Sequence, residues 1–128
     1  MKLDGIHHIA FNVRDLDRAE KFYTEVLGFK VSDRFSSGLR HIMLDTGNSA
    51  IALFEAPGLD TQSSLDLLSK TGYMHFAFRA DKNRFDSIVK ELGEKITIDE
   101  GPVKRGNGMS VYFNDPDGNH LEIHCDHE

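Results

Sequence analysis

Apolar and polar residues alternate along the chain in a way that divides it into two similar halves. Each half opens with a short segment of alternating apolar and polar residues, which is typical of a half-buried strand. A stretch with apolar residues at helical spacing follows, and then three more strand-like segments. The pattern therefore predicts the order βαβββ twice, in a first module at residues 1–56 and a second module at residues 72–128.

The two predicted helices are marked by apolar stripes and by residues typical of helix ends. In the first half the helix is expected to begin after Asp15, a good N-cap residue, and to end at Gly28. In the second half the stripe is expected to end at Gly93. The stripes consist of Leu16, Ala19, Phe22, Tyr23, Val26 and Leu27 in the first half and of Phe85, Ile88, Val89 and Leu92 in the second.

Strands are expected after each helix, with hairpin turns at Gly47-Asn48 and at Asp117-Gly118-Asn119. Residues 57–71 are predicted to be a linker, with a short apolar stretch at 65–68 that would form one or two helical turns. Each half is too small to fold stably by itself, so we expect one domain, 1–128, whose halves share a core. The later strands are predicted at 31–35, 40–44 and 50–55 and at 95–98, 109–113 and 120–124.

The first strands of the two halves repeat one motif, His-apolar-Ala-Phe, beginning at His8 and at His75. The last strands align so that Ala52 corresponds to Glu122. Side chains alternate across a sheet, and this parity directs both histidines and Glu122 away from the helices. If the halves are related by a pseudo-twofold axis, these side chains converge on the free faces of the sheets.

Two neutral imidazoles and one carboxylate suit a divalent ion such as Fe, Mn, Ni or Zn, with coordination positions left open for a substrate. Taken singly, each histidine would more often be a hydrogen-bonded strand residue, and Glu122 a solvated carboxylate. The repeat favours the metal site, because it was found from apolar residues and turns and yet places His8 and His75 in equivalent positions.

Composition narrows the possible partners of the chain. With 15 basic and 21 acidic side chains the net charge is −6, and the basic residues are scattered, which argues against nucleic acid as a partner. No apolar run is long enough to span a membrane, and no signal-peptide pattern opens the chain. Cys125 is the only cysteine, which excludes an internal disulfide and fits a reducing compartment. We therefore expect a cytoplasmic protein with a small-molecule substrate.

With these motifs the chain resembles the vicinal oxygen chelate superfamily, which includes glyoxalase I, extradiol dioxygenases, fosfomycin-modifying thiol transferases and bleomycin-binding resistance proteins. The likeness spans nearly all 128 residues. Its most specific block ends in an Asp-Pro-Asp-Gly turn, which fixes the register of the strand that carries Glu122. The motifs are the segments 8–16, Phe22-Tyr23, Leu27-Gly28-Phe29, 75–78 and 112–122.

The resemblance implies an α+β fold of two βαβββ modules whose mixed, curved sheets form a cup-shaped half-barrel. It also implies that His8, His75 and Glu122 bind one divalent metal ion, and that the substrate chelates this ion through adjacent oxygens. Short members of the family form homodimers, and in many of these the N-terminal module of one subunit pairs with the C-terminal module of the other. Each metal site would then draw on two chains.

The subfamilies differ at positions that can be checked in this chain. Glyoxalase I has a fourth ligand, usually Glu, where this chain has Ala52, so we favour ring-opening dioxygenation over isomerisation. The upstream histidine of the extradiol dioxygenases is nevertheless missing from residues 102–108, and the C-terminal arginine of the fosfomycin enzymes has no equivalent. A lyase of the glyoxalase type and a non-catalytic drug-binding protein are the alternatives.

Further polar residues are candidates around the predicted metal site. Tyr112 is our candidate for proton transfer or for a hydrogen bond to the substrate, beside Glu122 as a catalytic residue, although packing of Tyr112 in the core is about equally plausible. Lys104 and Arg105, in a predicted glycine-rich loop, could anchor an anionic substrate or simply be solvated. His124 shares a strand face with Glu122 and could support it.

Overall fold

The structure is a computed structural model that describes residues 1–60 and 71–127. The chain divides into two compact units, Met1–Asp60 and Thr61–Glu128. The division falls inside the predicted linker, and the apolar stretch at 65–68 lies outside the described residues.

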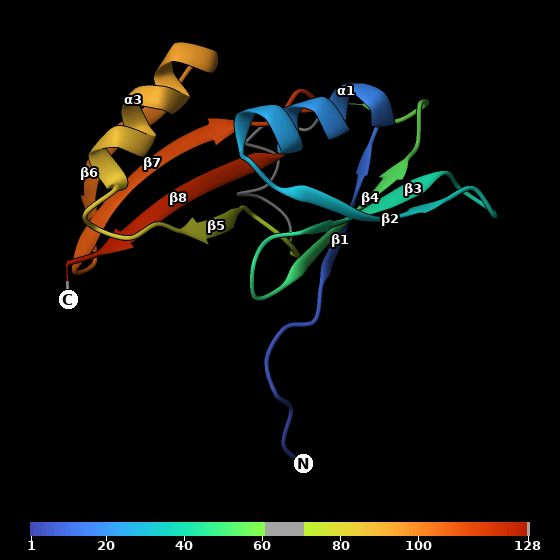
Figure 1. The fold of residues 1–128 in the computed structure, drawn as a ribbon, viewed down its shortest axis with the longest axis horizontal. Coiled ribbons are helices and arrows are strands. Elements are labelled where there is room, and N and C mark those ends of the chain that lie inside the picture. Colours follow the sequence, from blue (N-terminus) through green and yellow to red (C-terminus); the bar gives the residue numbers. More distant parts are fainter. Residues whose placement is uncertain (61–70, 128) are drawn as a thin grey trace. The chain divides into compact units, whose positions relative to one another are not determined.

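The first unit has the predicted order of elements. Its four strands form one sheet in the order β1-β4-β3-β2, in which β1 and β4 are parallel and the other neighbours antiparallel. The chain can be followed in Figure 1 from blue to green. The elements are β1 (Ile9–Val13), α1 (Leu16–Lys21), the π-helical segment η1 (Phe22–Val26), β2 (Lys30–Phe35), β3 (His41–Asp45) and β4 (Ala50–Glu55).

The second unit repeats this topology, with the strand order β5-β8-β7-β6 and β5 parallel to β8. The register agrees as well, since Ala10 lies opposite Ala52 in the first sheet and Ala77 lies opposite Glu122 in the second. The predicted α+β fold of two βαβββ modules is therefore confirmed. The elements are β5 (Phe76–Arg79), α3 (Phe85–Lys95), β6 (Glu100–Arg105), β7 (Gly108–Asn114) and β8 (His120–Asp126).

The first helix begins and ends where the sequence predicts. The side chain of Asp15 accepts a hydrogen bond from the backbone N–H of Arg18 at 3.1 Å, as an N-cap does. The helix stops at Gly28, whose φ of +80° suits a residue without a Cβ. Its second half is π-helical, and the N–H of Leu27 donates to the carbonyl of Phe22, five residues back, at 3.3 Å.

The end of the second helix differs from the prediction. The helix α3 runs through Gly93 to Lys95, where the N–H of Ile96 donates to the carbonyl of Leu92 at 2.9 Å. The prediction of a strand at 95–98 is therefore wrong, and the next strand, β6, begins only at Glu100. Lys104 and Arg105 belong to this strand rather than to a loop. Among the described residues, no helix is both long and apolar enough to cross a membrane.

Each sheet has one face packed with apolar side chains. In the first unit α1 contacts β4, and the ring of Tyr23 lies 6.0 Å from that of Phe11. In the second unit the apolar positions alternate along β7 and β8. The most buried apolar residues include Val13, Leu16, Ala19, Tyr23, Ile42, Leu44, Ile51, Ala52 and Leu53 in the first unit and Phe85, Leu92, Val111, Phe113, Leu121 and Cys125 in the second.

A compact turn joins β7 to β8, at the Asp-Pro-Asp-Gly sequence. The carboxylate of Asp115 accepts hydrogen bonds from the backbone N–H groups of Asp117 at 2.8 Å and Asn119 at 2.9 Å. Its other oxygen accepts from the side-chain amide of Asn119 at 2.8 Å. Gly118 completes the turn with a φ of +83°. These bonds hold the register that pairs Tyr112 with Glu122.

Candidate metal centre

The open face of the second sheet carries a row of polar side chains. The alternation of β8 puts Glu122, His124 and Asp126 on this face, opposite the apolar Leu121 and Ile123. Glu122 lies in the middle of the sheet, because β8 is flanked by two strands. Its backbone partners are Ala77 of β5 on one side and Tyr112 of β7 on the other.

His75 and Glu122 meet on this face, as the sequence predicts. His75 precedes β5, and its Nε2 lies 2.9 Å from Oε1 of Glu122. The Glu122 side chain is only 9% exposed, whereas that of His75 is 31% exposed. An imidazole nitrogen and a carboxylate oxygen that converge at the edge of solvent are donors that a divalent transition-metal ion prefers.

The second oxygen of Glu122 is held by a residue that the sequence analysis did not single out. The hydroxyl of Ser110, on β7, donates to Oε2 of Glu122 at 2.5 Å. Ser110 Oγ also lies 2.8 Å from Nδ1 of His124, and Nε2 of His124 lies 3.1 Å from Oδ1 of Asp126. The signal for Ser110 was its parity, since it lies two residues before Tyr112 on the same strand face.

Tyr112 lies beside this pair rather than in the core of the sheet. Its ring stands edge-on to that of His75 at 6.1 Å and is parallel to that of His120 at 5.9 Å. The guanidinium of Arg105 lies 5.5 Å from the centre of the Tyr112 ring, within the range of a cation–π contact. Tyr112 is therefore placed on the face that carries Glu122.

Asp126 and Tyr73 are among the groups of the second unit whose pKa values are shifted. Hydrogen bonds from Arg79 and from His124 lower the pKa of Asp126, so this carboxylate stays charged at the end of the polar row. Burial, and then the charge of Asp115, raise the pKa of Tyr73 to about 12. The Tyr73 hydroxyl donates to the carbonyl of His120 at 3.1 Å, which makes it a neutral support for β8.

The first unit contributes His8, at the position equivalent to His75. Its side chain is exposed, and its Nδ1 lies 2.8 Å from Nδ1 of His7. The position equivalent to Glu122 is Ala52, and the carboxylate of Glu55 accepts from the backbone N–H of Leu16 at 2.9 Å instead. Glu55 therefore serves the start of α1. A meeting of His8 with His75 and Glu122 stays a prediction.

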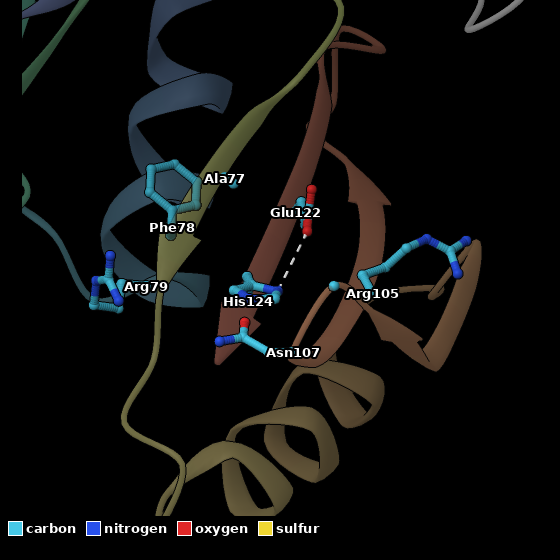
Figure 2. A pocket seen from close by; sticks show the side chains of 8 residues that line it. Ala77, Phe78, Arg79, Arg105, Asn107, Glu122 and His124 are labelled. Atoms are coloured by element: carbon cyan, nitrogen blue, oxygen red, sulfur yellow. Dashed lines mark ion pairs between the residues drawn. The ribbon is translucent and has the colours of Figure 1, made fainter. Parts of the chain in front are cut away.

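A cavity of about 380 Å³ opens on the polar face of the second sheet. Figure 2 shows Glu122 and His124 in line along β8, with the labelled residues of β5 on one side and Arg105 on the other. The volume suits a small molecule, because ligand pockets commonly begin at about 300 Å³. The residues that line it are Ala77, Phe78, Arg79, Arg105, Gly106, Asn107, Glu122 and His124.

The donor set of the second unit fits part of a metal site. In residues 1–60 and 71–127, no three or more His, Cys, Asp or Glu side chains are grouped so that they could hold a metal ion. His75 and Glu122 do converge, and their donor atoms and partial exposure are of a kind that suits a metal with open positions for substrate. The described residues of this unit thus bring together one candidate nitrogen and one candidate oxygen donor.

Residues 5–123 match the family described as the glyoxalase/bleomycin resistance protein/dioxygenase superfamily. A putative lactoylglutathione lyase of Brassica oleracea var. gemmifera is 32% identical over 91% of this chain, and this chain spans only 42% of its length. The metallothiol transferase FosB of Staphylococcus epidermidis is 30% identical over 97% of this chain and 83% of its own length.

Solved structures agree with this match. A glyoxalase/dioxygenase from Nostoc punctiforme is 33% identical, with a TM-score of 0.74 over 97% of this chain and 92% of that chain. The fosfomycin resistance protein FosX of Listeria monocytogenes also has a TM-score of 0.74, over 97% of this chain and 94% of that chain. At 20% identity, this second likeness concerns the fold alone.

Proposed function

The chain belongs to the glyoxalase/bleomycin resistance protein/dioxygenase superfamily, and from this premise we propose that it is an enzyme that uses one divalent metal ion, held by His8, His75 and Glu122. Its substrate is a small molecule that binds the ion through two adjacent oxygens. The observation that carries the proposal is the 2.9 Å approach of His75 Nε2 to Glu122 Oε1. Relatives named metallothiol transferases, whose name itself refers to a metal, support it.

The ion would act as a Lewis acid that stabilises negative charge developing on a substrate oxygen. The remaining functions belong to side chains of the second unit. Tyr112 stands beside His75 and donates a hydrogen bond, or a proton, to the substrate. Arg105 supports the Tyr112 ring from the rim of the cavity. The apolar Ala77 leaves room for the substrate next to Glu122.

Thiol transfer is the first reaction class to test. The relatives that this chain matches over most of both lengths include metallothiol transferases and a glutathione transferase, whereas it matches less than half of the lactoylglutathione lyase. The lyase mechanism of glyoxalase I uses a second carboxylate, and this chain has Ala52 at the equivalent position. Both points favour transfer of a thiol over isomerisation.

Ring-opening dioxygenation, which the sequence analysis favours, is the second class. The Nostoc punctiforme structure, described as a glyoxalase/dioxygenase, supports keeping it. Two assays separate the classes. Loss of free thiol in the presence of fosfomycin would indicate thiol transfer, and oxygen consumption in the presence of a catechol would indicate dioxygenation.

Metal content tests the proposal itself. Protein purified without chelator should carry about one divalent ion per chain, and His8→Ala, His75→Ala and Glu122→Ala should each lose it. A His41→Ala variant is the matched control, because His41 stacks between Phe35 and Phe54 in the first unit and should leave the metal content unchanged. Equal metal content in the parent and in the three ligand variants would refute the proposed site. Tight binding of a drug by metal-free protein would favour the drug-binding alternative.

A further inference from the structure

Ser110 is fully buried, and its hydroxyl contacts two side chains on the polar face of the second sheet, those of Glu122 and His124. An ionised carboxylate can only accept hydrogen bonds, so the single proton of Ser110 points to Oε2 of Glu122, 2.5 Å away. The serine oxygen then has only lone pairs left for Nδ1 of His124, 2.8 Å away, and it accepts a hydrogen bond in the tautomer that carries the proton on Nδ1. Both partners therefore fix the hydroxyl in one orientation.

The contacts continue beyond His124 across the sheet. Nε2 of His124 lies 3.1 Å from Oδ1 of Asp126, and the other oxygen of Asp126 is paired with the guanidinium of Arg79 on β5. Ser110, His124, Asp126 and Arg79 form what we call the supporting row. It connects three neighbouring strands, β7, β8 and β5, and it ends at Glu122.

We propose that Ser110 is a positioning residue that holds Oε2 of Glu122 and so leaves Oε1, beside His75, as the oxygen offered to the metal. This inference rests on the proposed function. Without the hydroxyl, the carboxylate could turn about its last side-chain bond and offer either oxygen or both. The contact with His124 limits the rotation of the serine side chain, because Nδ1 of His124 lies 2.8 Å from the serine oxygen.

The position of the supporting row indicates that Ser110 does more than stabilise the sheet. Glu122, His124 and Arg79 line the cavity, so the row borders the space in which a ligand would sit. Residues that only stabilise β7 against β8 have their side chains on the other face, as Val111 and Ile123 do. A change at Ser110 should therefore alter metal binding as well as the free energy of unfolding.

Titration of the full, chelator-treated chain with Co(II) alone tests the proposal. We expect Ser110→Ala to bind Co(II) about 10–100-fold more weakly than the parent, with a changed visible spectrum, because the number of coordinating oxygens changes. Ser110→Thr keeps the hydroxyl and should retain the parent spectrum and most of the affinity. Ser32→Ala removes a serine hydroxyl from an exposed position of β2 and should change neither quantity.

The outcomes distinguish this role from the proposed function. Co(II) binding by Ser110→Ala within twofold of the parent, with the parent spectrum, would overturn the role of Ser110 and leave the metal site standing. Equal Co(II) binding by the parent and by Glu122→Ala would overturn both. Should Ser110→Ala fail to fold, His124→Ala decides the question. This variant removes the side chain that contacts the Ser110 oxygen, but it leaves the Ser110 hydroxyl able to donate to Glu122. It should weaken Co(II) binding several-fold, and unchanged binding would contradict the proposal.

Discussion

Two neighbouring side chains offset the free-energy cost of burying the Glu122 carboxylate. Removing a carboxylate from water is unfavourable unless its oxygens are hydrogen-bonded or paired. Glu122 meets this condition at both oxygens, through His75 on one side and Ser110 on the other. The same contacts that make a charged side chain tolerable in the sheet also orient it, so stability and function share one set of atoms.

The repeat in the sequence was sufficient to find His75 and Glu122, since both residue types and both positions recur or align between the halves. Ser110 was not found, because a serine within a strand has no distinctive pattern and its partners lie on another strand. Residue type and position in the repeat suggest candidate ligands from the sequence, whereas the side chains that contact those candidates become visible only once the strand register is known.

An ion pair in the first unit gives a prediction for pH. Both oxygens of Glu20 on α1 accept from the guanidinium of Arg34 on β2, at 2.6 and 2.8 Å. This hydrogen bonding lowers the pKa of Glu20 below its usual value of 4.5. The stabilisation is therefore fully present above pH 4.5 and is lost as the pH falls through the lowered pKa of the folded protein.

We expect Arg34→Ala to reduce the free energy of unfolding only slightly at pH 7, since the pair is largely exposed and solvent screens it. The difference from the parent should shrink as the pH falls well below 4.5. Urea denaturation at several pH values measures this. Arg34→Lys is the control. It keeps the positive charge but not the bidentate hydrogen bond, so it separates the contribution of the charge from that of the hydrogen bonds. A difference between the parent and Arg34→Ala that does not depend on pH would contradict this explanation.

At the scale of elements, helix starts were more predictable than helix ends. Asp15 marks the start of α1 by a side-chain hydrogen bond that depends only on local sequence. The end of α3 differs from the prediction, because Gly93, which is expected to stop the helix, lies inside it. The neighbours Glu91, Glu94 and Lys95 are good helix formers, and together they outweigh one glycine.

Two glycines of the second unit should respond oppositely to alanine. A Cβ at Gly93 would lie 3.6 Å from Ile98 Cδ1, an ordinary contact, so Gly93→Ala should raise the free energy of unfolding by about 0.5–1 kcal/mol. A Cβ at Gly108 would lie 1.9 Å from the carbonyl oxygen of Cys125, so Gly108→Ala should lower it by about 1–3 kcal/mol. Chemical denaturation of both variants measures the two effects. Loss of stability in Gly93→Ala would show that α3 ends earlier than Lys95.

At the scale of the whole molecule, the residues of the proposed site are divided between the two units. His75 and Glu122 lie in the second unit, and His8 lies in the first. Pseudo-symmetry was predictable from the sequence because each half repeats the same strand order and register. The number of chains that form one site depends on how subunits assemble, and local sequence patterns do not encode this.

We propose that the protein forms a homodimer whose metal sites each combine His8 of one subunit with His75 and Glu122 of the other. Mixing His8→Ala with Glu122→Ala tests this. If subunits exchange at random, half of the dimers carry one intact site, so about one quarter of all sites should bind metal again. Either variant alone should bind none. Absence of recovery after exchange, shown by dimers that contain both variants, would place each site within one chain.

The most direct test of the proposed centre is anomalous X-ray scattering from crystals of the full chain grown with Zn(II). We predict an anomalous peak about 2.0–2.2 Å from a ring nitrogen of His8, a ring nitrogen of His75 and a carboxylate oxygen of Glu122. A peak bonded to other residues, or a peak at His75 and Glu122 with His8 far from it in every neighbouring subunit, would contradict the proposed metal centre.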